Sequence, residues 1–198
     1  MIDSPQLLVL AGPNGAGKST VASAFLQMTG VGEFVNVDEI AKGLSAFHPE
    51  RVALRAGQSA LERMKELSEC RTSFAIETTL AARTYAGMIQ KLKLAGYNIT
   101  LVFVWLPNPE LAIQRVSDRV QAGGHRIPEE AIRRRYQSGL DNLFELYIPI
   151  VDKWVVCDGS HLGALSVIAS GTPGTSQAVV QPDLWERMKH GLSRPVEI

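Results

Sequence analysis

Short apolar runs and helix-like patterns alternate along most of the chain. Apolar runs of strand length occur at residues 6–11, 33–37, 73–77, 98–106 and 153–157. Between them, apolar positions recur with the spacing of one helix face, which predicts helices at residues 17–28, 38–44, 49–70, 81–95, 108–121 and 128–147. Strands that alternate with helices in this way are typical of βαβ units around a parallel sheet.

The pattern weakens after the fifth strand. Residues 165–169 and 178–181 are expected to pair as a hairpin across residues 171–176, and a short helix at 182–190 follows. The sequence shows no internal repeat and no change of composition that would mark a domain boundary. It therefore predicts one α/β domain over residues 1–198, with a three-layer αβα arrangement around a central, mainly parallel five-stranded sheet.

The composition of the chain mainly argues against certain partners and locations. Twenty basic residues balance twenty acidic ones, which argues against non-specific binding to nucleic acid or to a membrane surface. No apolar stretch approaches the ~18 residues of a membrane span, and the N-terminus lacks the features of a signal peptide. Cys70 and Cys157 form no CxxC motif and are expected to be reduced thiols. We expect a cytoplasmic protein with no nucleic-acid or membrane partner.

A complete P-loop follows the first apolar run. The motif has the pattern GxxxxGK[ST] and consists of Gly12, Pro13, Asn14, Gly15, Ala16, Gly17, Lys18, Ser19 and Thr20. In this motif backbone N–H groups wrap around phosphate oxygens, the lysine reaches the β and γ phosphates, and the serine hydroxyl binds Mg²⁺. A helix that begins near Gly17 adds the positive end of its dipole. The sequence therefore predicts a P-loop NTPase that binds ATP and Mg²⁺.

Four polar side chains follow the second and third predicted strands. Asp38 ends the second strand, and Glu77, Thr78 and Thr79 end the third. Because ligands bind beyond the carboxyl ends of parallel strands, we expect these side chains to lie beside the γ-phosphate. Asp38 is the candidate base for an acceptor hydroxyl, and Glu77 can hold Mg²⁺ through water or hold that hydroxyl. The two threonines can donate hydrogen bonds to a substrate.

Each of these residues also has a simpler interpretation. Asp38 can cap the helix that follows it, and Glu77 can be a solvated strand end. Thr78 and Thr79 can satisfy backbone groups in a turn. The sequence leaves both interpretations open.

Six arginines lie close together on and between two predicted helices that flank Gly123 and Gly124. They are Arg115, Arg119, Arg126, Arg133, Arg134 and Arg135. Two helices joined by glycines are typical of a closing lid, here at about 108–148, whose guanidinium groups can stabilise a transferred phosphoryl group. The alternative is a pair of solvated helix faces with Asp118, Glu129 and Glu130 as ion-pair partners. His125, next to the glycines, can meet a phosphate in the lid interpretation.

The chain resembles the zeta toxin family of P-loop kinases, in its compact single-domain branch. The segments that carry the resemblance are residues 12–20, 36–40, 74–80, 123–128 and 133–136. Together they cover roughly residues 6–158. The P-loop is shared by many families, whereas the later segments are more specific.

The resemblance implies an ATP·Mg²⁺ phosphotransferase with the strand order of other P-loop kinases. Characterised members of the family phosphorylate a 3′-hydroxyl on the amino sugar of UDP-N-acetylglucosamine. By resemblance, Lys18 and Ser19 hold the ATP phosphates and Mg²⁺, and Asp38 is the base. Glu77 and Thr79 contact the UDP-sugar, and the arginines that clamp the phosphate are Arg119, Arg126 and Arg135, with Arg134 as a further substrate contact.

Other functions remain as alternatives at this stage. The chain can be a P-loop kinase for another small hydroxyl substrate, such as a free sugar, a nucleoside or an antibiotic, or a nucleotide-binding protein without turnover. A GTP-dependent switch is disfavoured because the [NT]KxD motif of guanine-specific GTPases is absent from the sequence. An antitoxin-type protein inhibitor is the partner that a toxin role would require.

Overall fold

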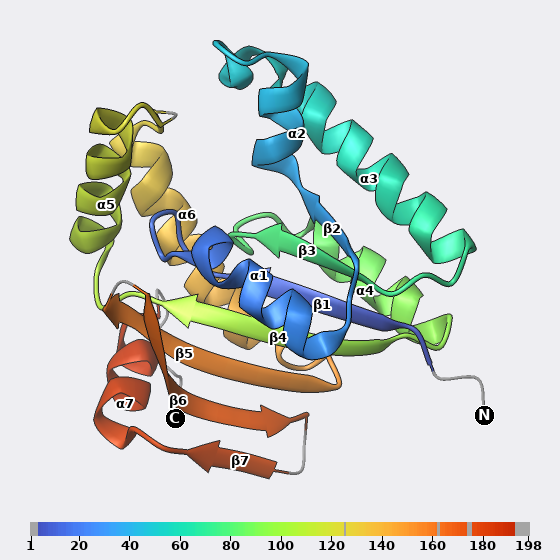
Figure 1. Cartoon of the computed structure of the whole chain (residues 1–198). Helices are drawn as coiled ribbons and strands as arrows, with labels where there is room; N and C mark the ends of the chain where they lie inside the picture. The colour runs from blue at the N-terminus through green and yellow to red at the C-terminus, as the bar shows by residue number, and fades with distance from the viewer. Residues whose placement is uncertain (1–3, 125, 162, 174–175, 193–198) are drawn as a thin grey trace.

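A seven-stranded sheet runs through the part of the chain that the computed structural model describes, which is residues 4–124, 126–161, 163–173 and 176–192 (Figure 1). The strand order is β2-β3-β1-β4-β5-β6-β7. The bounds are β1 (Gln6–Ala11), β2 (Glu33–Asn36), β3 (Phe74–Thr78), β4 (Asn98–Trp105), β5 (Lys153–His161), β6 (Ala164–Thr172) and β7 (Ser176–Val179).

The mainly parallel sheet predicted from the sequence is confirmed, but its extent is larger than predicted. The first five strands in the order, from β2 to β5, are parallel, and β6 and β7 continue the sheet antiparallel. The predicted hairpin is therefore confirmed. It adds two strands to the five that were predicted, so the sheet in the described residues has seven. It joins the sheet because β5 continues beyond Cys157 to His161 and turns back directly into β6.

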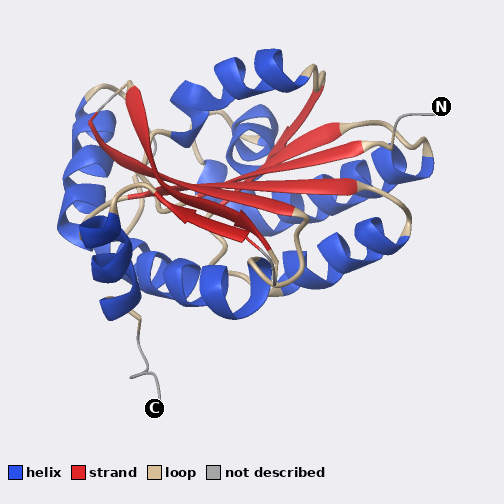
Figure 2. Ribbon diagram, turned by 90° about the horizontal axis from the view of Figure 1, so that it is seen from below, coloured by secondary structure: helices blue, strands red, loops and turns tan. Residues whose placement is uncertain are grey.

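Helices cover both faces of the sheet, which gives the predicted three layers (Figure 2). Their bounds are α1 (Lys18–Thr29), α2 (Val37–Leu44), α3 (Ala53–Glu69), α4 (Thr84–Leu94), α5 (Pro109–Gln121), α6 (Glu129–Asn142) and α7 (Pro182–His190). A 3₁₀ turn, η1 (Pro49–Val52), precedes α3, and a π-helical turn, η2 (Leu143–Tyr147), extends α6. Within the described residues, no helix is both long and apolar enough to cross a membrane.

The central strand β1 is buried on both faces, as its unbroken apolar sequence predicts. Leu7 and Val9 pack in one cluster with residues of α3, α4, α6 and α7. Leu8 and Leu10 point to the opposite face, where α1 covers them. The rigid sheet therefore fixes the loop that follows β1, which is the P-loop.

The tryptophans pack in the core, and the cysteines are free thiols as the sequence predicts. Trp154 of β5 and Trp185 of α7 stack with ring centroids 5.6 Å apart, which fixes the C-terminal helix to the core, and Trp105 is also buried. Cys70 is exposed and Cys157 is buried, and both thiols are free.

The start of α4 differs from the prediction. The sequence pattern predicts a helix from residue 81, whereas α4 begins at Thr84. Directly before the predicted start, Leu80 has a φ of +56°, and the carbonyl oxygens of Leu80 and Ala82 accept hydrogen bonds from the side chains of Asn142 and Tyr147. Residues 79–83 consequently form a loop at the carboxyl end of β3.

Candidate active site

The P-loop lies between β1 and α1 and depends on its glycines. Gly12 has a φ of +138°, and a Cβ atom there would collide with the carbonyl oxygen of Val104. Gly17 has a φ of +86° and forms the N-terminal cap of α1. Lys18 and Ser19 are thus the first helical residues, where backbone N–H groups have no partner within the helix. This end of α1 therefore has the free N–H groups and the positive dipole end that bind an anion such as phosphate.

Lys18 brings a charge into the protein interior. Only 6% of the residue is exposed, and its Nζ atom donates to the carbonyl oxygen of Pro13 at 3.0 Å. Burial lowers the pKa of the Lys18 ammonium group, while the nearby carboxylates of Glu77 and Asp38 act in the opposite direction. The Glu77 Oε1 atom lies 3.7 Å from Nζ. The two carboxylates therefore favour the charged form that a phosphate ligand needs.

Glu77 connects three elements of the site. Its Oε2 atom accepts hydrogen bonds from the Ser19 hydroxyl at 2.8 Å and from the Asn36 amide at 2.9 Å. A hydroxyl and a carboxylate side by side are the hard oxygen donors that Mg²⁺ prefers. The two metal-ligating residues predicted from the sequence therefore lie together, and their chemistry fits Mg²⁺.

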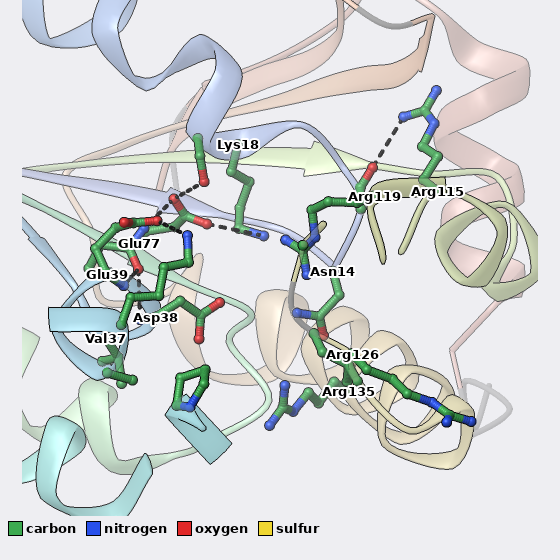
Figure 3. A pocket seen from close by; sticks show the side chains of 18 of the residues that line it. Asn14, Lys18, Val37, Asp38, Glu39, Glu77, Arg115, Arg119, Arg126 and Arg135 are labelled. Atoms are coloured by element: carbon green, nitrogen blue, oxygen red, sulfur yellow. Dashed lines mark hydrogen bonds and ion pairs between the residues drawn. The ribbon is translucent and has the colours of Figure 1, made fainter. Parts of the chain in front are cut away.

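The hydrogen bonds of Asn36 distinguish between the two interpretations of Asp38, as a helix cap or as a residue that faces the cavity. The Asn36 Oδ1 atom accepts from the backbone N–H groups of Asp38 at 2.9 Å and Glu39 at 3.3 Å, so Asn36 is the N-terminal cap of α2. The alternative in which Asp38 caps this helix is therefore wrong. The Asp38 carboxylate is instead directed into the cavity beside the P-loop (Figure 3).

Two cavities meet at the P-loop. The larger has a volume of about 710 Å³ and the smaller about 240 Å³. Both are lined by Asn14, Lys18, Asn36, Val37, Asp38, Glu77 and Arg135. These shared residues mark a boundary where a ligand in one cavity can touch a ligand in the other.

The Asn14 side chain is buried at this boundary. Only 7% of Asn14 is exposed, and its Oδ1 atom has no hydrogen-bond partner within the described protein. Buried polar atoms are normally paired. A bound ligand that donates a hydrogen bond would satisfy this oxygen.

The loop after β3 forms one wall of the smaller cavity. Thr78, Thr79, Ala81, Ala82 and Tyr85 line it. The Thr78 hydroxyl accepts a hydrogen bond from the Leu80 N–H at 3.1 Å, so Thr78 has the turn role that the sequence left as its simpler interpretation. The structure places Thr79 at the cavity, as the substrate-binding prediction requires.

The arginine cluster separates into three groups. Arg119, Arg126 and Arg135 line the larger cavity and lie opposite Asp38 and Glu77 (Figure 3). Arg133 instead pairs with Glu110, and Arg134 is exposed and is not among the cavity-lining residues. The geometry therefore supports three of the four arginines selected from the sequence and gives no support to a substrate contact by Arg134.

Arg115 braces the site. Its guanidinium group donates to the carbonyl oxygens of Gly159 and Ser160, both at 2.7 Å, and to that of Gly15 at 3.3 Å. These bonds tie α5 to the P-loop and to the end of β5. Arg115 thus holds the phosphate-binding loop in place.

The two glycines between α5 and α6 end a helix. The Gly124 N–H donates to the Arg119 carbonyl and the Gly123 N–H to the Val120 carbonyl, which is a Schellman motif with Gly123 at a φ of +88°. This cap fixes the direction in which the chain leaves α5. The predicted phosphate contact of His125 lies outside the described residues.

Sequence reasoning missed the structural roles of three residues at the site. The role of Asn36 as cap had a signal, because Asn two residues before Asp-Glu is a common helix start. Tyr85, which lines the smaller cavity, had none, because it occupies an ordinary helical position. Arg115 was grouped with the lid and only its contacts reveal its role.

Comparisons with known proteins give a family and a fold. A protein-family model described as Zeta toxin matches residues 2–156 of the chain. An uncharacterized protein of Haemophilus influenzae is 27% identical over 125 residues, which is 63% of this chain and 88% of that protein.

Solved structures show the same fold at low sequence identity. The AvrRxo1-ORF1:AvrRxo1-ORF2 complex with sulphate ions matches with a TM-score of 0.77 and 18% identity over 98% of this chain and 66% of that chain. The same complex has been solved with ATP. The PezAT chromosomal toxin–antitoxin system of Streptococcus pneumoniae matches with a TM-score of 0.64 and 17% identity over 97% of this chain and 89% of that chain. The chain thus spans less than two thirds of the matched AvrRxo1 chain.

Proposed function

Because the chain belongs to the zeta toxin family, we propose that it is an ATP-dependent phosphotransferase that acts on a hydroxyl group of a small molecule. The acceptor that we propose is the nucleotide-activated sugar UDP-N-acetylglucosamine, which the family resemblance implies. The observation that carries the proposal is the boundary between the two cavities at Lys18, Asp38 and Glu77. A lysine for the donor phosphates and a carboxylate for the acceptor hydroxyl are the groups that phosphoryl transfer requires there.

The donor side of the site is built by the P-loop. In the proposal, the ATP phosphates lie against the N-terminus of α1, where backbone N–H groups and Lys18 contact them. Ser19 and Glu77 are the residues that would hold Mg²⁺, which would neutralise charge on the β and γ phosphates.

The acceptor side is the smaller cavity, where Asp38 meets the loop after β3. Asp38 takes the proton of the acceptor hydroxyl as its oxygen bonds to the γ-phosphorus. The bond from that phosphorus to the bridging oxygen breaks in the same step, and ADP leaves. Guanidinium groups of Arg119, Arg126 and Arg135 stabilise the charge on the transferred group.

The cavity volumes limit what the acceptor can be. The larger cavity, at about 710 Å³, falls within the ~300–1,000 Å³ that is usual for small-molecule pockets. The smaller one, at about 240 Å³, falls below that range and accommodates one ring-sized group. An acceptor such as a nucleotide sugar would place one ring in the smaller cavity and the remainder towards the larger one.

A protein partner belongs to the same proposal. The PezAT structure comes from a toxin–antitoxin system, and we propose that an antitoxin-type inhibitor binds this chain as well. An inhibitor that covers the mouth of the larger cavity would compete with ATP.

Phosphorus NMR of the purified protein with ATP, Mg²⁺ and an acceptor panel tests the proposal. The panel contains UDP-N-acetylglucosamine, free N-acetylglucosamine, a nucleoside and an aminoglycoside antibiotic. We expect a new phosphomonoester resonance with UDP-N-acetylglucosamine. A resonance with another member alone would retain the reaction and discard the sugar. Bound ATP with no transfer to any member would contradict the proposal.

A further inference from the structure

The loop after β3 holds an unusual backbone conformation. Leu80 is fully buried and has a φ of +56°, although it has the Cβ atom that makes this region unfavourable. Strain of this kind persists only where surrounding contacts hold it, and it is typical of functional sites. The contacts that hold Leu80 therefore indicate what the strained loop serves.

Side chains of α6 and η2 bind this loop at successive positions. The Asn142 amide donates to the Leu80 carbonyl oxygen at 2.8 Å, and the Tyr147 hydroxyl donates to the Ala82 carbonyl oxygen at 2.7 Å. Asn142 and Tyr147 are both buried. Gly139 completes the set, because a Cβ atom there would collide with the Thr79 carbonyl oxygen.

The π-helical turn explains how two residues five apart reach one loop. In a regular α-helix, residues five positions apart point in different directions. The η2 turn has the wider i to i+5 hydrogen bond, seen between the Ile148 N–H and the Leu143 carbonyl at 2.9 Å. This turn brings Asn142 and Tyr147 to the same side. Such turns occur often at functional sites.

The same helix also carries Arg135, one of the arginines that we propose to stabilise the transferred phosphate. Arg135 lies four residues before Gly139, which is about one helical turn, and it lines both cavities. Four residues in and beside the loop line the smaller cavity and not the larger one: Thr78, Thr79, Ala81 and Ala82. Helix α6 therefore contacts the wall of the smaller cavity and also places Arg135 at the boundary where we propose that the phosphate is transferred.

We propose that Gly139, Asn142 and Tyr147 are positioning residues that hold loop 79–82 as the wall of the acceptor cavity, in a fixed relation to Arg135. The inference rests on the proposed kinase function and deepens it. In this inference, α6 determines how tightly the acceptor binds, whereas the P-loop, Arg115 and α1 determine how tightly ATP binds. A loop displaced by ~1 Å can lower transfer on the order of 10²-fold.

The test compares three variants of the whole chain. Gly139→Ala displaces Thr79, and Asn142→Ala removes the bond to Leu80. Gln137→Ala is the matched control, since Gln137 also donates from α6 to a carbonyl oxygen, that of Gly191 at 2.8 Å, but on the far side from the loop. With ATP and UDP-N-acetylglucosamine, we expect about a tenfold or greater rise in acceptor KM for the first two and less than about twofold change in ATP KM. The control should change neither.

Equal increases in both KM values, or the same acceptor effect in Gln137→Ala, would overturn the inference. A second measurement does not depend on which acceptor is used. Hydrogen exchange should accelerate in peptides covering residues 78–86 of Asn142→Ala and stay unchanged in those covering 12–20. Unchanged exchange in 78–86 would also overturn it. If the wild-type protein transfers nothing to UDP-N-acetylglucosamine, the sugar assignment fails, and exchange still decides whether α6 holds the wall.

Discussion

Lys18 carries an ammonium group into the interior beside Glu77 and Asp38. Burial opposes the charged form, and the two carboxylates support it. Lys18→Met keeps the length of the side chain and removes the charge. We expect a loss of thermal stability, because the Glu77 carboxylate and the Pro13 carbonyl lose a buried partner, and a fall in turnover of about 10²–10³-fold, because a donor to the transferred group is lost.

Lys42→Met is the control for this variant. Lys42 lines the same cavity but is exposed and paired with Glu39 at 2.6 Å. Thermal unfolding and steady-state kinetics of both variants make the comparison. Near wild-type turnover in Lys18→Met would show that Lys18 does not stabilise the transferred phosphate.

Glu77 is expected to set the metal requirement. Its carboxylate accepts from the Ser19 hydroxyl at 2.8 Å, and Glu77→Gln preserves the shape while removing the charge. Loss of a group that supports metal binding typically costs 10–100-fold in affinity, so the Mg²⁺ concentration for half-maximal turnover should rise by about that factor. A Mg²⁺ titration measures it. The same half-maximal concentration in both proteins would argue against a metal role for Glu77.

At the scale of elements, α2 links helix stability to catalysis. Asn36 caps this helix and also donates to Glu77 at 2.9 Å. Asn36→Ala should cost about 1 kcal/mol of stability and lower turnover, because Asp38 sits on the first turn of α2. Asn108→Ala is matched, since the Asn108 Oδ1 atom caps α5 by accepting from the Leu111 N–H at 2.9 Å.

Denaturant unfolding and turnover of the two cap variants separate the effects. Both should lose similar stability, and only Asn36→Ala should lose activity. A parallel loss of activity in Asn108→Ala would show that reduced stability alone explains the result.

Sequence patterns predicted the strands whose unbroken apolar runs reflect burial on both faces. The strands β1 and β4 were placed within one residue of their observed bounds because both are almost wholly buried. The start of α4 was placed too early because the loop before it is held by side chains of Asn142 and Tyr147, which are distant in sequence. Asp38 and Glu77 were found because parallel strands end at one edge. The role of Arg115 was not found, because it binds backbone carbonyl oxygens, which every residue has and which give no signal in the sequence.

At the scale of the whole molecule, the hairpin was predicted but its place in the sheet was not. Polar residues such as Asp158, Ser160 and His161 hid the extension of β5 that pairs with β6. This extension also matters for the site, because Arg115 binds the carbonyl oxygens of Gly159 and Ser160. The antiparallel part of the sheet therefore supports the P-loop through α5.

The thiols report whether this sheet is intact. Cys157 is buried in β5, and burial raises the pKa of its thiol to about 11, whereas Cys70 is exposed. A raised pKa leaves less reactive thiolate at pH 8. Iodoacetamide should therefore label Cys70 alone in the native protein and both thiols in denaturant, as mass spectrometry can show. Native labelling of Cys157 at a rate similar to that of Cys70 would contradict the packing of β5.

The central claim is that Asp38 acts on an acceptor hydroxyl at the boundary of two cavities. The most direct measurement is turnover and ATP affinity of Asp38→Asn beside Glu39→Gln, an adjacent carboxylate that lines only the larger cavity. We expect Asp38→Asn to lose about 10²–10⁴-fold in kcat with unchanged ATP affinity, and Glu39→Gln to keep its activity. Wild-type kcat in Asp38→Asn with ATP still bound would contradict the proposed mechanism.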